Sequence, residues 1–311
     1  MMMKALVLCG GKGTRLRPLT YALAKQLLPV ANKPVLFYIL EQIQNAGVQE
    51  VGIVVSPEYR EQFKAKLDQY RDWDMSFTYI EQDEPGGLAH AVSCARHFLG
   101  DASFLMFLGD NLYQRGVQKF VQNFIVSGPD AALQLARVEN PRQCGVAVLG
   151  EGNRVLRAVE KPEDPPGNLA IAGIYLFKPV IHEAIGRIRL SRRGELEITD
   201  AIQMLIDMGC RVEGELMEGW WVDTGTREGM LYANRLILEE HGRRAVKGRV
   251  DGASEVTGKV EMGEGTVIEN SMIKGPVVLG RNVLVRDSYI GPYTSVGSHA
   301  VVEGSGVDYS I

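Results

Sequence analysis

Apolar and polar residues alternate in two different ways along the chain, and the first pattern runs from Lys4 to about Glu240. Three short apolar runs have the character of buried parallel strands: ALVLC (5–9), VGIVV (51–55) and SFLMFLG (103–109). Three longer stretches carry apolar residues at helical spacing: 35–46, 58–70 and 88–99. Strands that alternate with helices predict an α/β domain of three layers, α/β/α, with a mainly parallel sheet and right-handed crossovers.

The second pattern begins near Val250, where the helical periodicity ends and Gly, Val, Ile and Ser dominate. Aliphatic residues then recur about every six positions, with changes of phase at 274–279 and 285–290: Val256, Met262, Ile268, Leu279, Val285, Ile290, Val296 and Val302. A Gly-rich loop would not keep such a period, so this hexapeptide repeat predicts a parallel β-helix. A helical stretch over 227–240 divides the chain into residues 1–242 and a tail of residues 243–311.

The repeat stops in the middle of a coil at Ile311. Because the end of a solenoid usually needs a polar cap, we expect a partner to cover this end, or the chain to be truncated. The expected role of the tail is in subunit contacts or regulation, which favours a homo-oligomer.

Composition excludes several classes of protein. The net charge is −4, from 34 basic and 38 acidic residues, so we expect neither nucleic acid nor a membrane surface as a partner. The four cysteines are far apart and form no CxxC pair, which favours reduced thiols in a cytoplasmic protein over a disulfide framework or zinc site. No apolar run reaches the length of a membrane span, ~18 residues.

A glycine-rich segment, GGKGTRLRP (10–18), directly follows the first predicted strand. Ligands of open α/β sheets lie beyond the carboxyl ends of the strands, and Gly10, Gly11 and Gly13 let the backbone approach an anion there. Arg15 adds a permanent charge with forked donors for phosphate oxygens. The spacing fits neither the P-loop nor the dinucleotide-binding fingerprint. The segment therefore predicts a phosphate site of another kind.

Two aspartates follow apolar runs in a similar way. Asp110 comes after FLMFLG and Asp223 after GWWV, so each projects from the end of a predicted strand. Mg²⁺ bound with phosphate substrates commonly uses one or two protein carboxylates, and this pair predicts such a site. Asp110 is equally suited to a turn in GDN, and Asp223 to capping a helix that starts near Thr226.

Six motifs in order identify a family. GGKGTRLRPLT with AKQLLPVANKP is followed by EQDEPGGLAHAV, FLGDNLY, EKP, RGELEITDA and GWWVDTGT, and together they resemble the sugar nucleotidyltransferases. Within that family the chain is most similar to the glucose-1-phosphate thymidylyltransferases. The paired tryptophans and the repeat tail resemble their long form, which implies a left-handed parallel β-helix after the catalytic domain.

The resemblance implies a Mg²⁺-dependent reaction of dTTP with glucose 1-phosphate, giving dTDP-glucose and pyrophosphate. Since both substrates are anionic, positioning and charge neutralisation would supply most of the catalysis. By resemblance Arg15 steadies the leaving pyrophosphate and Lys25 lies at the α-phosphate. Gln82 and Gly87 would read the pyrimidine edge, and Leu8 would contribute backbone groups.

The same resemblance assigns a sugar site to the second half of this region. Its residues are Gly145, Glu160, Lys161, Arg193 and Glu195. Carboxylates can accept hydrogen bonds from sugar hydroxyls, and the basic residues can meet the sugar phosphate. The stretch RGELEITDA also suits a helix start capped by Thr199. One position departs from the family pattern, because many members have Tyr where this chain has Cys144.

Three alternatives stay open at this point. UTP, or another sugar phosphate such as N-acetylglucosamine 1-phosphate, would need only a few different hydrogen bonds in the pocket. Acyl transfer by the β-helix would use His299 as a base, although a lone His is more often a surface residue. A binding-only relative is a third possibility, and the presence of Arg15, Lys25, Asp110 and Asp223 argues against it.

Overall fold

The computed structural model describes residues 3–70 and 73–311, which divide into two compact units. The first unit comprises Met1–Gly13, Thr20–Ala24 and Ile39–Trp221. The second comprises Thr14–Leu19, Lys25–Tyr38 and Val222–Ile311. Within the described part of the chain, no helix combines the length and the apolar character needed to traverse a bilayer.

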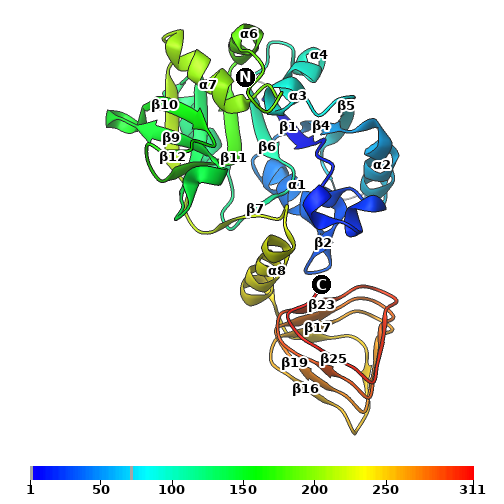
Figure 1. The fold of residues 1–311 in the computed structure, drawn as a ribbon. Helices are drawn as coiled ribbons and strands as arrows, with labels where there is room; N and C mark the ends of the chain where they lie inside the picture. Colours follow the sequence, from blue (N-terminus) through cyan, green and yellow to red (C-terminus); the bar gives the residue numbers. More distant parts are fainter. Residues whose placement is uncertain (1–2, 71–72) are drawn as a thin grey trace. The chain divides into compact units, whose positions relative to one another are not determined.

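A nine-stranded mixed sheet forms the centre of the first unit (Figure 1). Its strands are β1 (Lys4–Cys9), β4 (Glu50–Val55), β5 (Ser76–Glu81), β6 (Phe104–Leu108), β8 (Ala131–Arg137), β9 (Gly145–Leu149), β10 (Val155–Glu160), β11 (Leu169–Phe177) and β12 (Val212–Leu216). The main path is β10-β9-β11-β6-β1-β4-β5, and β12 joins β11 through β8. The three predicted apolar runs are β1, β4 and β6, and they lie parallel as expected.

The register of the parallel strands aligns their carboxyl ends. Leu8 lies beside Leu108, Cys9 beside Val55, and Val55 beside Glu81. The segments that follow β1, β4, β5 and β6 therefore leave the same edge of the sheet, which is where ligands of such sheets bind.

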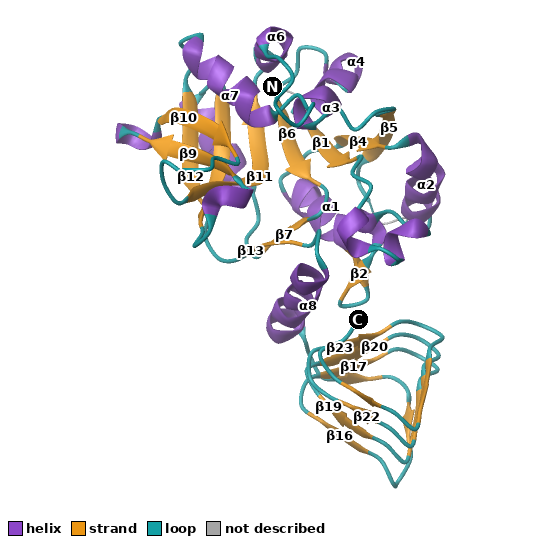
Figure 2. Cartoon of the chain, viewed as in Figure 1, coloured by secondary structure: helices purple, strands orange, loops and turns teal. Residues whose placement is uncertain are grey.

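Helices of the first unit connect these strands (Figure 2). They are α2 (Arg60–Asp68), α3 (Leu88–Cys94), α4 (Arg96–Leu99), α5 (Gln118–Ser127), α6 (Ile181–Arg187) and α7 (Ile198–Asp207). The helix predicted over 58–70 begins later, after a 3₁₀ turn at Pro57–Tyr59. The single helix predicted over 88–99 is wrong in one respect, because Ala95 takes angles of φ −83° and ψ 0° and divides it into α3 and α4.

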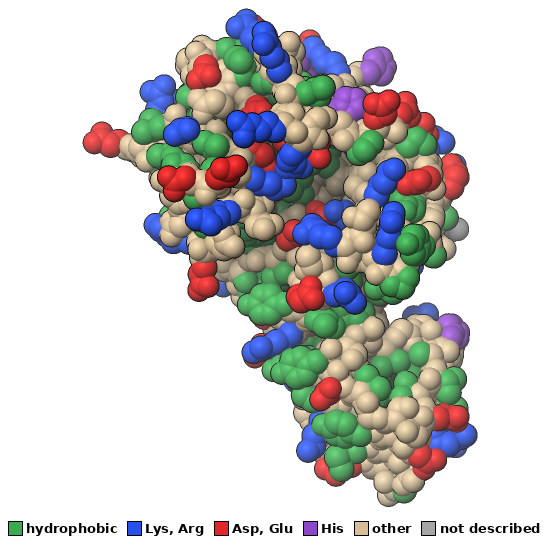
Figure 3. Space-filling view, viewed as in Figure 1, with side chains coloured by type: hydrophobic (Ala, Val, Ile, Leu, Met, Phe, Trp, Pro, Cys, Tyr) green, Lys and Arg blue, Asp and Glu red, His purple; other side chains and the backbone are tan. Residues whose placement is uncertain are grey.

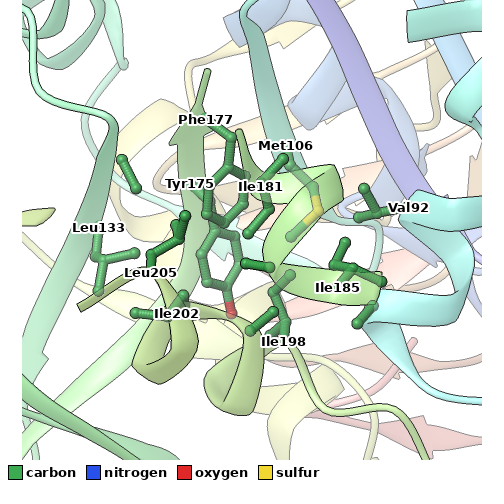
Figure 4. Close-up of a cluster of buried hydrophobic side chains, with 14 of the residues drawn as sticks. Val92, Met106, Leu133, Tyr175, Phe177, Ile181, Ile185, Ile198, Ile202 and Leu205 are labelled. Carbon is green, nitrogen blue, oxygen red and sulfur yellow. The ribbon is translucent and has the colours of Figure 1, made fainter. Parts of the chain in front are cut away.

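A hydrophobic core joins α3, α6 and α7 to the sheet. Ile181 and Ile185 of α6 face Ile198 and Ile202 of α7. The side chain of Tyr175, from strand β11 of the sheet, packs in the same cluster (Figure 4). All five side chains are buried, at ~1.5–3 kcal/mol for each large apolar side chain. This packing fixes the strand ends that carry the candidate site.

The second unit contains three short segments near the start of the chain and one long helix. They are the 3₁₀ turns Thr14–Leu16 and Lys25–Leu27, the hairpin of β2 (Pro29–Val30) with β3 (Lys33–Pro34), and α8 (Arg227–His241). The helix α1 (Val35–Asn45) begins in this unit and ends in the first. The prediction of a helix over 227–240 is confirmed, and the Thr226 side chain caps it by accepting from the Gly229 amide at 3.0 Å. Two further short strands are β7 (Asn111–Tyr113) in the first unit and β13 (Trp221–Asp223) at the point where the chain passes into the second.

The tail consists of three four-stranded parallel sheets, consistent with a β-helix. Their strands are β14 (Ala245–Val246), β17 (Val260–Met262), β20 (Val277–Leu279) and β23 (Thr294–Val296); β15 (Arg249–Val250), β18 (Val267–Glu269), β21 (Leu284–Arg286) and β24 (Val301–Glu303); and β16 (Glu255–Thr257), β19 (Met272–Lys274), β22 (Tyr289–Ile290) and β25 (Gly306–Val307). Val260 lies beside Val277 and Val277 beside Thr294, so neighbouring positions are 17 residues apart. Each coil thus has 17 residues, one fewer than three hexapeptides, and this missing residue shifts the phase of the six-residue repeat once per coil. It also explains why Ile273, buried at 0% exposure, falls outside the six-residue count.

Candidate active site

The loop after β5 presents Gln82 at the carboxyl edge of the sheet. Its backbone N–H donates to the Val55 carbonyl at 2.9 Å, and its side chain is buried. The side-chain Nε2 lies 3.1 Å from the Gly87 carbonyl and 3.1 Å from His90 Nδ1. Gly10 leaves room for this amide, since a Cβ there would lie 2.6 Å from Gln82 Oε1. The side chain is thus held in one orientation by Gly87 and His90.

Gly87 joins this loop to the segment that carries Glu195. Its φ of +96° is a conformation that L side chains rarely adopt, and a Cβ there would lie 2.5 Å from the Leu196 carbonyl oxygen. Leu196 N–H donates to the Gly86 carbonyl at 2.8 Å, and Ala89 N–H donates to the Leu196 carbonyl at 3.0 Å. The predicted base-reading loop and a predicted sugar residue therefore adjoin within the first unit.

Glu160, at the end of β10, is surrounded by donors. Thr199 Oγ1 donates to its Oε2 at 2.6 Å, and Arg193 NH1 donates to its Oε1 at 3.3 Å. Lys161 Nζ lies 3.6 Å from the same Oε1. The prediction that Thr199 caps α7 is wrong. Glu197 occupies the N-cap position of this helix, and the Thr199 hydroxyl donates to Glu160 instead.

Arg193 connects three carboxylates in this cluster. Its NH2 donates to Glu195 Oε2 at 2.7 Å, and its NH1 lies 3.7 Å from Glu197 Oε1. Burial lowers the pKa of Arg193, but the hydrogen bond to Glu195 and the charges of Glu197, Glu195 and Glu160 outweigh it, so the pKa is raised. Burial raises the pKa of Glu197, and burial followed by the charge of Glu160 raises the pKa of Asp200. The cluster is rich in acceptors for hydroxyl groups and is anchored by one guanidinium.

Gly145 and Lys161 lie at the same place on the antiparallel pair β9–β10. Gly145 is the register partner of Glu160, and the Lys161 amide donates to the Cys144 carbonyl at 3.1 Å. Lys161 has φ +39°, which is uncommon for a residue with a side chain. Such strain is found at ligand-binding positions more often than elsewhere.

The glycine-rich segment straddles the two units. Leu8 is buried in β1, and its carbonyl accepts from the Gly109 amide at 2.9 Å. The Gly10 carbonyl accepts from Ser56 Oγ at 2.8 Å, and the Gly13 carbonyl accepts from Thr20 Oγ1 at 2.7 Å. Gly11, between them, is exposed. These hydrogen bonds fix the carbonyls on the protein side of the bend.

Arg15 and Asp223 meet within the second unit. Arg15 NH2 lies 3.9 Å from Asp223 Oδ2, with side-chain exposures of 62% and 46%. Asp223 Oδ1 accepts from the Gly225 amide at 2.8 Å. Neighbouring Leu16 is buried and anchors the 3₁₀ turn that presents Arg15. The guanidinium thus faces solvent next to a carboxylate held by backbone.

Lys25 opens the 3₁₀ turn Lys25–Leu27 and is half-buried. The next side chain, Gln26, is 1% exposed, and its Oε1 has no hydrogen-bond partner among the residues that the structure describes. Gln26 could not be predicted as a site residue from the sequence, because a Gln between a Lys and two leucines carries no signal by itself.

Asp110 follows β6 in the first unit. Its Oδ1 accepts from Asn111 Nδ2 at 2.9 Å, and Asn111 Oδ1 accepts from Trp221 Nε1 at 2.5 Å. Across residues 3–70 and 73–311, no three His, Cys, Asp or Glu side chains are arranged to hold a metal ion.

The predicted site residues therefore fall into two groups. The first unit holds Leu8, Gly10, Gly11, Gly13, Gln82, Gly87, Asp110, Gly145, Glu160, Lys161, Arg193 and Glu195. The second holds Arg15, Lys25 and Asp223. On the face shown in Figure 3, Lys and Arg side chains alternate with Asp and Glu, in keeping with the small net charge.

Residues 4–240 match the profile of the family described as "Nucleotidyl transferase". The chain belongs to this family. A glucose-1-phosphate thymidylyltransferase of Streptomyces griseus is 50% identical over 309 residues, covering 99% of this chain and 86% of the relative.

Solved structures agree with this assignment to the nucleotidyl transferases. A Bacillus anthracis protein assigned as a glucose-1-phosphate thymidylyltransferase and solved with sucrose has a TM-score of 0.70 and 32% identity, covering 75% of this chain and 94% of that one. A UDP-glucose pyrophosphorylase from Acinetobacter baumanii has a TM-score of 0.66 and 26% identity, covering 78% and 95%. The α/β nucleotidyltransferase fold with a mainly parallel sheet is confirmed.

Three side chains that hold site residues in place were not predicted from the sequence. They are Ser56 on the Gly10 carbonyl, His90 on Gln82, and Thr199 on Glu160. Each residue lies in a different element from its partner, so no local spacing pairs them. His90 lies in α3, eight positions after Gln82, and reaches it only because the chain turns between them.

Proposed function

We propose that this nucleotidyl transferase moves a thymidylyl group from dTTP to glucose 1-phosphate, giving dTDP-glucose and pyrophosphate. The observation that carries the proposal is the junction of the Gln82–Gly87 loop with Glu195–Leu196. Gln82, which would bind the base, and Glu195, which would bind the sugar, lie on adjoining segments of backbone. This suits a product that contains a base and a sugar. The identity of 50% to the Streptomyces griseus thymidylyltransferase supports the same substrates.

In the proposed reaction an oxygen of the sugar phosphate attacks the α-phosphorus of dTTP. The bond from that phosphorus to the bridging oxygen breaks, and pyrophosphate leaves with its electron pair. Arg15 would hold the leaving phosphates through its forked donors, and Lys25 would neutralise charge at the α-phosphate. No protein base is needed, because the attacking oxygen is already ionised at neutral pH.

The sugar would lie at the carboxylate cluster. Glu160 and Glu195 would accept hydrogen bonds from its hydroxyls, with Gly145 leaving space at the start of β9. Lys161 and Arg193 would meet the sugar phosphate. These contacts would orient the nucleophile, and orientation is a large share of catalysis between two anions.

Mg²⁺ completes the proposal, with Asp110 and Asp223 as its protein ligands. Carboxylate oxygens are the ligands that Mg²⁺ prefers, and one or two of them suffice when phosphates supply the rest. When bound, the ion would neutralise the phosphate charge that Arg15 and Lys25 leave uncompensated.

A second pair of substrates is supported by the chemistry of Gln82. Thymine and uracil present the same imide edge, so an amide held by Gly87 and His90 would accept either base. UTP, or N-acetylglucosamine 1-phosphate as the sugar, is therefore the competing assignment. Pyrophosphate release measured for dTTP, UTP, CTP and ATP against both sugar phosphates tests the proposal. The highest kcat/KM for dTTP with glucose 1-phosphate supports it, and the highest value for another pair overturns it.

The proposal extends to architecture and location. It assigns residues 1–242 to a three-layer catalytic domain and residues 243–311 to a left-handed β-helix in a homo-oligomer, in the cytoplasm. The proposed location rests on the four cysteines, which form no disulfide with one another, because disulfides are rare in that compartment. Sedimentation gives the oligomeric state, cell fractionation the location and a crystal structure the hand of the coil.

A further inference from the structure

A fully buried asparagine on α8 connects the hairpin β2–β3 with the last coils of the tail, and all three belong to the second unit. Asn234 is 0% exposed. Its Oδ1 accepts from the Ala31 amide at 2.8 Å and from Ser295 Oγ at 2.6 Å. Its Nδ2 donates to the carbonyls of Tyr293 at 2.8 Å and Ser310 at 3.5 Å. The amide therefore uses both acceptor positions and both donors.

Such a satisfied amide fixes geometry more than it adds stability. A neutral hydrogen bond contributes only ~0.5–1.5 kcal/mol net, while a buried donor or acceptor left without a partner costs ~1–3 kcal/mol. Each of the four bonds has its own direction, so the hairpin tip, α8 and the coil have one mutual arrangement that satisfies all of them. An apolar residue on α8 would pack there without specifying that arrangement.

A second link joins the same hairpin to the same coil. Asn32 Nδ2 donates to the Val296 carbonyl at 2.8 Å. Ala31 and Asn32 have φ of 48° and 61°, so the tip is a tight turn with a defined shape. The tip of the hairpin is therefore hydrogen-bonded to the tail directly through Val296, and indirectly through Asn234, which also binds Ser295.

The base of this hairpin is the turn that carries Lys25. Leu28 N–H donates to the Lys25 carbonyl at 3.2 Å, and Val35 N–H donates to the Leu28 carbonyl at 3.1 Å. β2 pairs with β3 between these bonds and the tip. Few rotatable bonds therefore separate Ala31, which is hydrogen-bonded to Asn234, from the 3₁₀ turn at Lys25–Leu27.

We propose that Asn234 is a positioning residue for Lys25, and that the β-helix supports the phosphate-binding turn through it. The inference rests on the proposed function, in which Lys25 lies at the α-phosphate. It assigns to the tail a role in the chemical step in addition to any role in assembly. A displacement of a catalytic group by about 1 Å can cost roughly 100-fold in rate, so a loosened hairpin would show first in kcat.

The variants that test this are Asn234→Leu, Ser295→Ala and Asn32→Gly in the full chain. Glycine at 32 keeps the positive φ while it removes the amide link. Ser288→Ala is the matched control, since Ser288 is also a buried serine of the tail but bonds only within it. Thermal unfolding of each variant establishes that it is folded at the assay temperature, and Ser295→Ala and Asn32→Gly serve if Asn234→Leu does not fold.

We expect kcat to fall roughly 10- to 100-fold in Asn234→Leu, and less in the other two variants, with KM for the sugar phosphate unchanged. Ser288→Ala should match the wild type. Equal kcat in folded Asn234→Leu and wild type, or equal losses in Ser288→Ala and Ser295→Ala, would overturn the proposal.

Hydrogen exchange of the 24–35 segment gives a readout that does not depend on turnover. Its backbone amides should exchange faster in Asn234→Leu and Asn32→Gly than in wild type and Ser288→Ala. Unchanged exchange in this segment would refute the support role. If the wild type releases no pyrophosphate, the proposed function fails on its own and hydrogen exchange still decides whether the tail holds this turn.

Discussion

The two compact units hold their charged side chains in different ways. In the first unit Glu160, Arg193, Glu195 and Thr199 are already bonded to one another at 2.6–3.3 Å. In the second unit Arg15 and Asp223 stand 3.9 Å apart, both substantially exposed. A pair of that kind is worth only ~0–1 kcal/mol, so a phosphate can replace the carboxylate beside Arg15 at little cost.

This contrast separates recognition from charge neutralisation. Base and sugar are neutral or weakly charged groups that need directed hydrogen bonds, and such bonds require a prebuilt site. A triphosphate brings its own charge and needs cations that are exposed enough to contact it. We therefore expect changes at the phosphate and metal residues to act mainly on kcat, and changes at the base and sugar residues to act mainly on KM.

Replacement of Arg15 should have the largest effect. Arg15→Ala should lower kcat/KM by roughly 100- to 1000-fold, because it removes a donor from the leaving pyrophosphate. Stability should change by less than ~1 kcal/mol, since the ion pair with Asp223 is exposed. Steady-state pyrophosphate release and urea unfolding measure both, with Arg244→Ala as an exposed control. A normal kcat/KM would remove Arg15 from the site.

Replacement of Asp223 comes next. Asp223→Asn keeps an acceptor for the Gly225 amide but loses the charge that a divalent cation requires. We expect kcat to fall at least tenfold, with a higher Mg²⁺ concentration needed for half-maximal rate and with the fold intact by circular dichroism. Asp110→Asn should behave alike. An unaltered Mg²⁺ dependence in both variants would contradict the assignment of these ligands.

Replacement of Glu160 probes the first unit. Glu160→Gln weakens charge-assisted bonds from Arg193 and Thr199, each worth ~1.5–3 kcal/mol, which corresponds to roughly 10- to 100-fold. This loss should appear in KM for glucose 1-phosphate, while KM for dTTP should stay close to the wild-type value. Glu151→Gln, on an exposed turn, is the control. A loss in kcat alone would contradict the assignment of Glu160 to sugar binding.

The smallest expected effect is a pH dependence of stability in the first unit. Burial, and then the charge of Arg96, lowers the pKa of His182 from 6.5 to about 4, and its ring stacks on Phe104. Because the folded pKa is depressed, this contribution to stability is complete above pH ~6.5 and is lost as the pH falls toward 4. His182→Phe should remove part of the difference between urea midpoints at pH 7 and pH 5. An equal difference in both proteins would exclude His182 as its source.

Much of this arrangement follows from local sequence, and some of it does not. The strands β1, β4 and β6 are continuous apolar runs, and the inward residues of the tail recur with a fixed period, so both were predictable. The glycine-rich bend, Gln82 and Glu160 were found through motif resemblance. Their roles as binding residues are still predictions, although Gln82 and the Glu160 cluster lie in one compact unit.

Contacts between distant elements could not be predicted. The bond from Thr199 to Glu160 spans 39 positions, and the bond from Ala31 to Asn234 spans 203. A buried Asn in a helix reads locally as a weak helix former, and only the assembled unit shows that its amide has four partners. The division of the site residues between two units is likewise a property of the fold, since Gly13 and Arg15 are nearly adjacent in the chain.

The central claim is that Gln82 reads the base of dTTP while Arg15 and Lys25 hold its phosphates. A crystal structure of the full chain with dTTP and Mg²⁺ tests it most directly. The account predicts the thymine edge within hydrogen-bond distance of Gln82, and the phosphates of the same molecule within hydrogen-bond distance of Arg15 and Lys25. A dTTP molecule held at Gln82 while Arg15 and Lys25 contact no phosphate would contradict it.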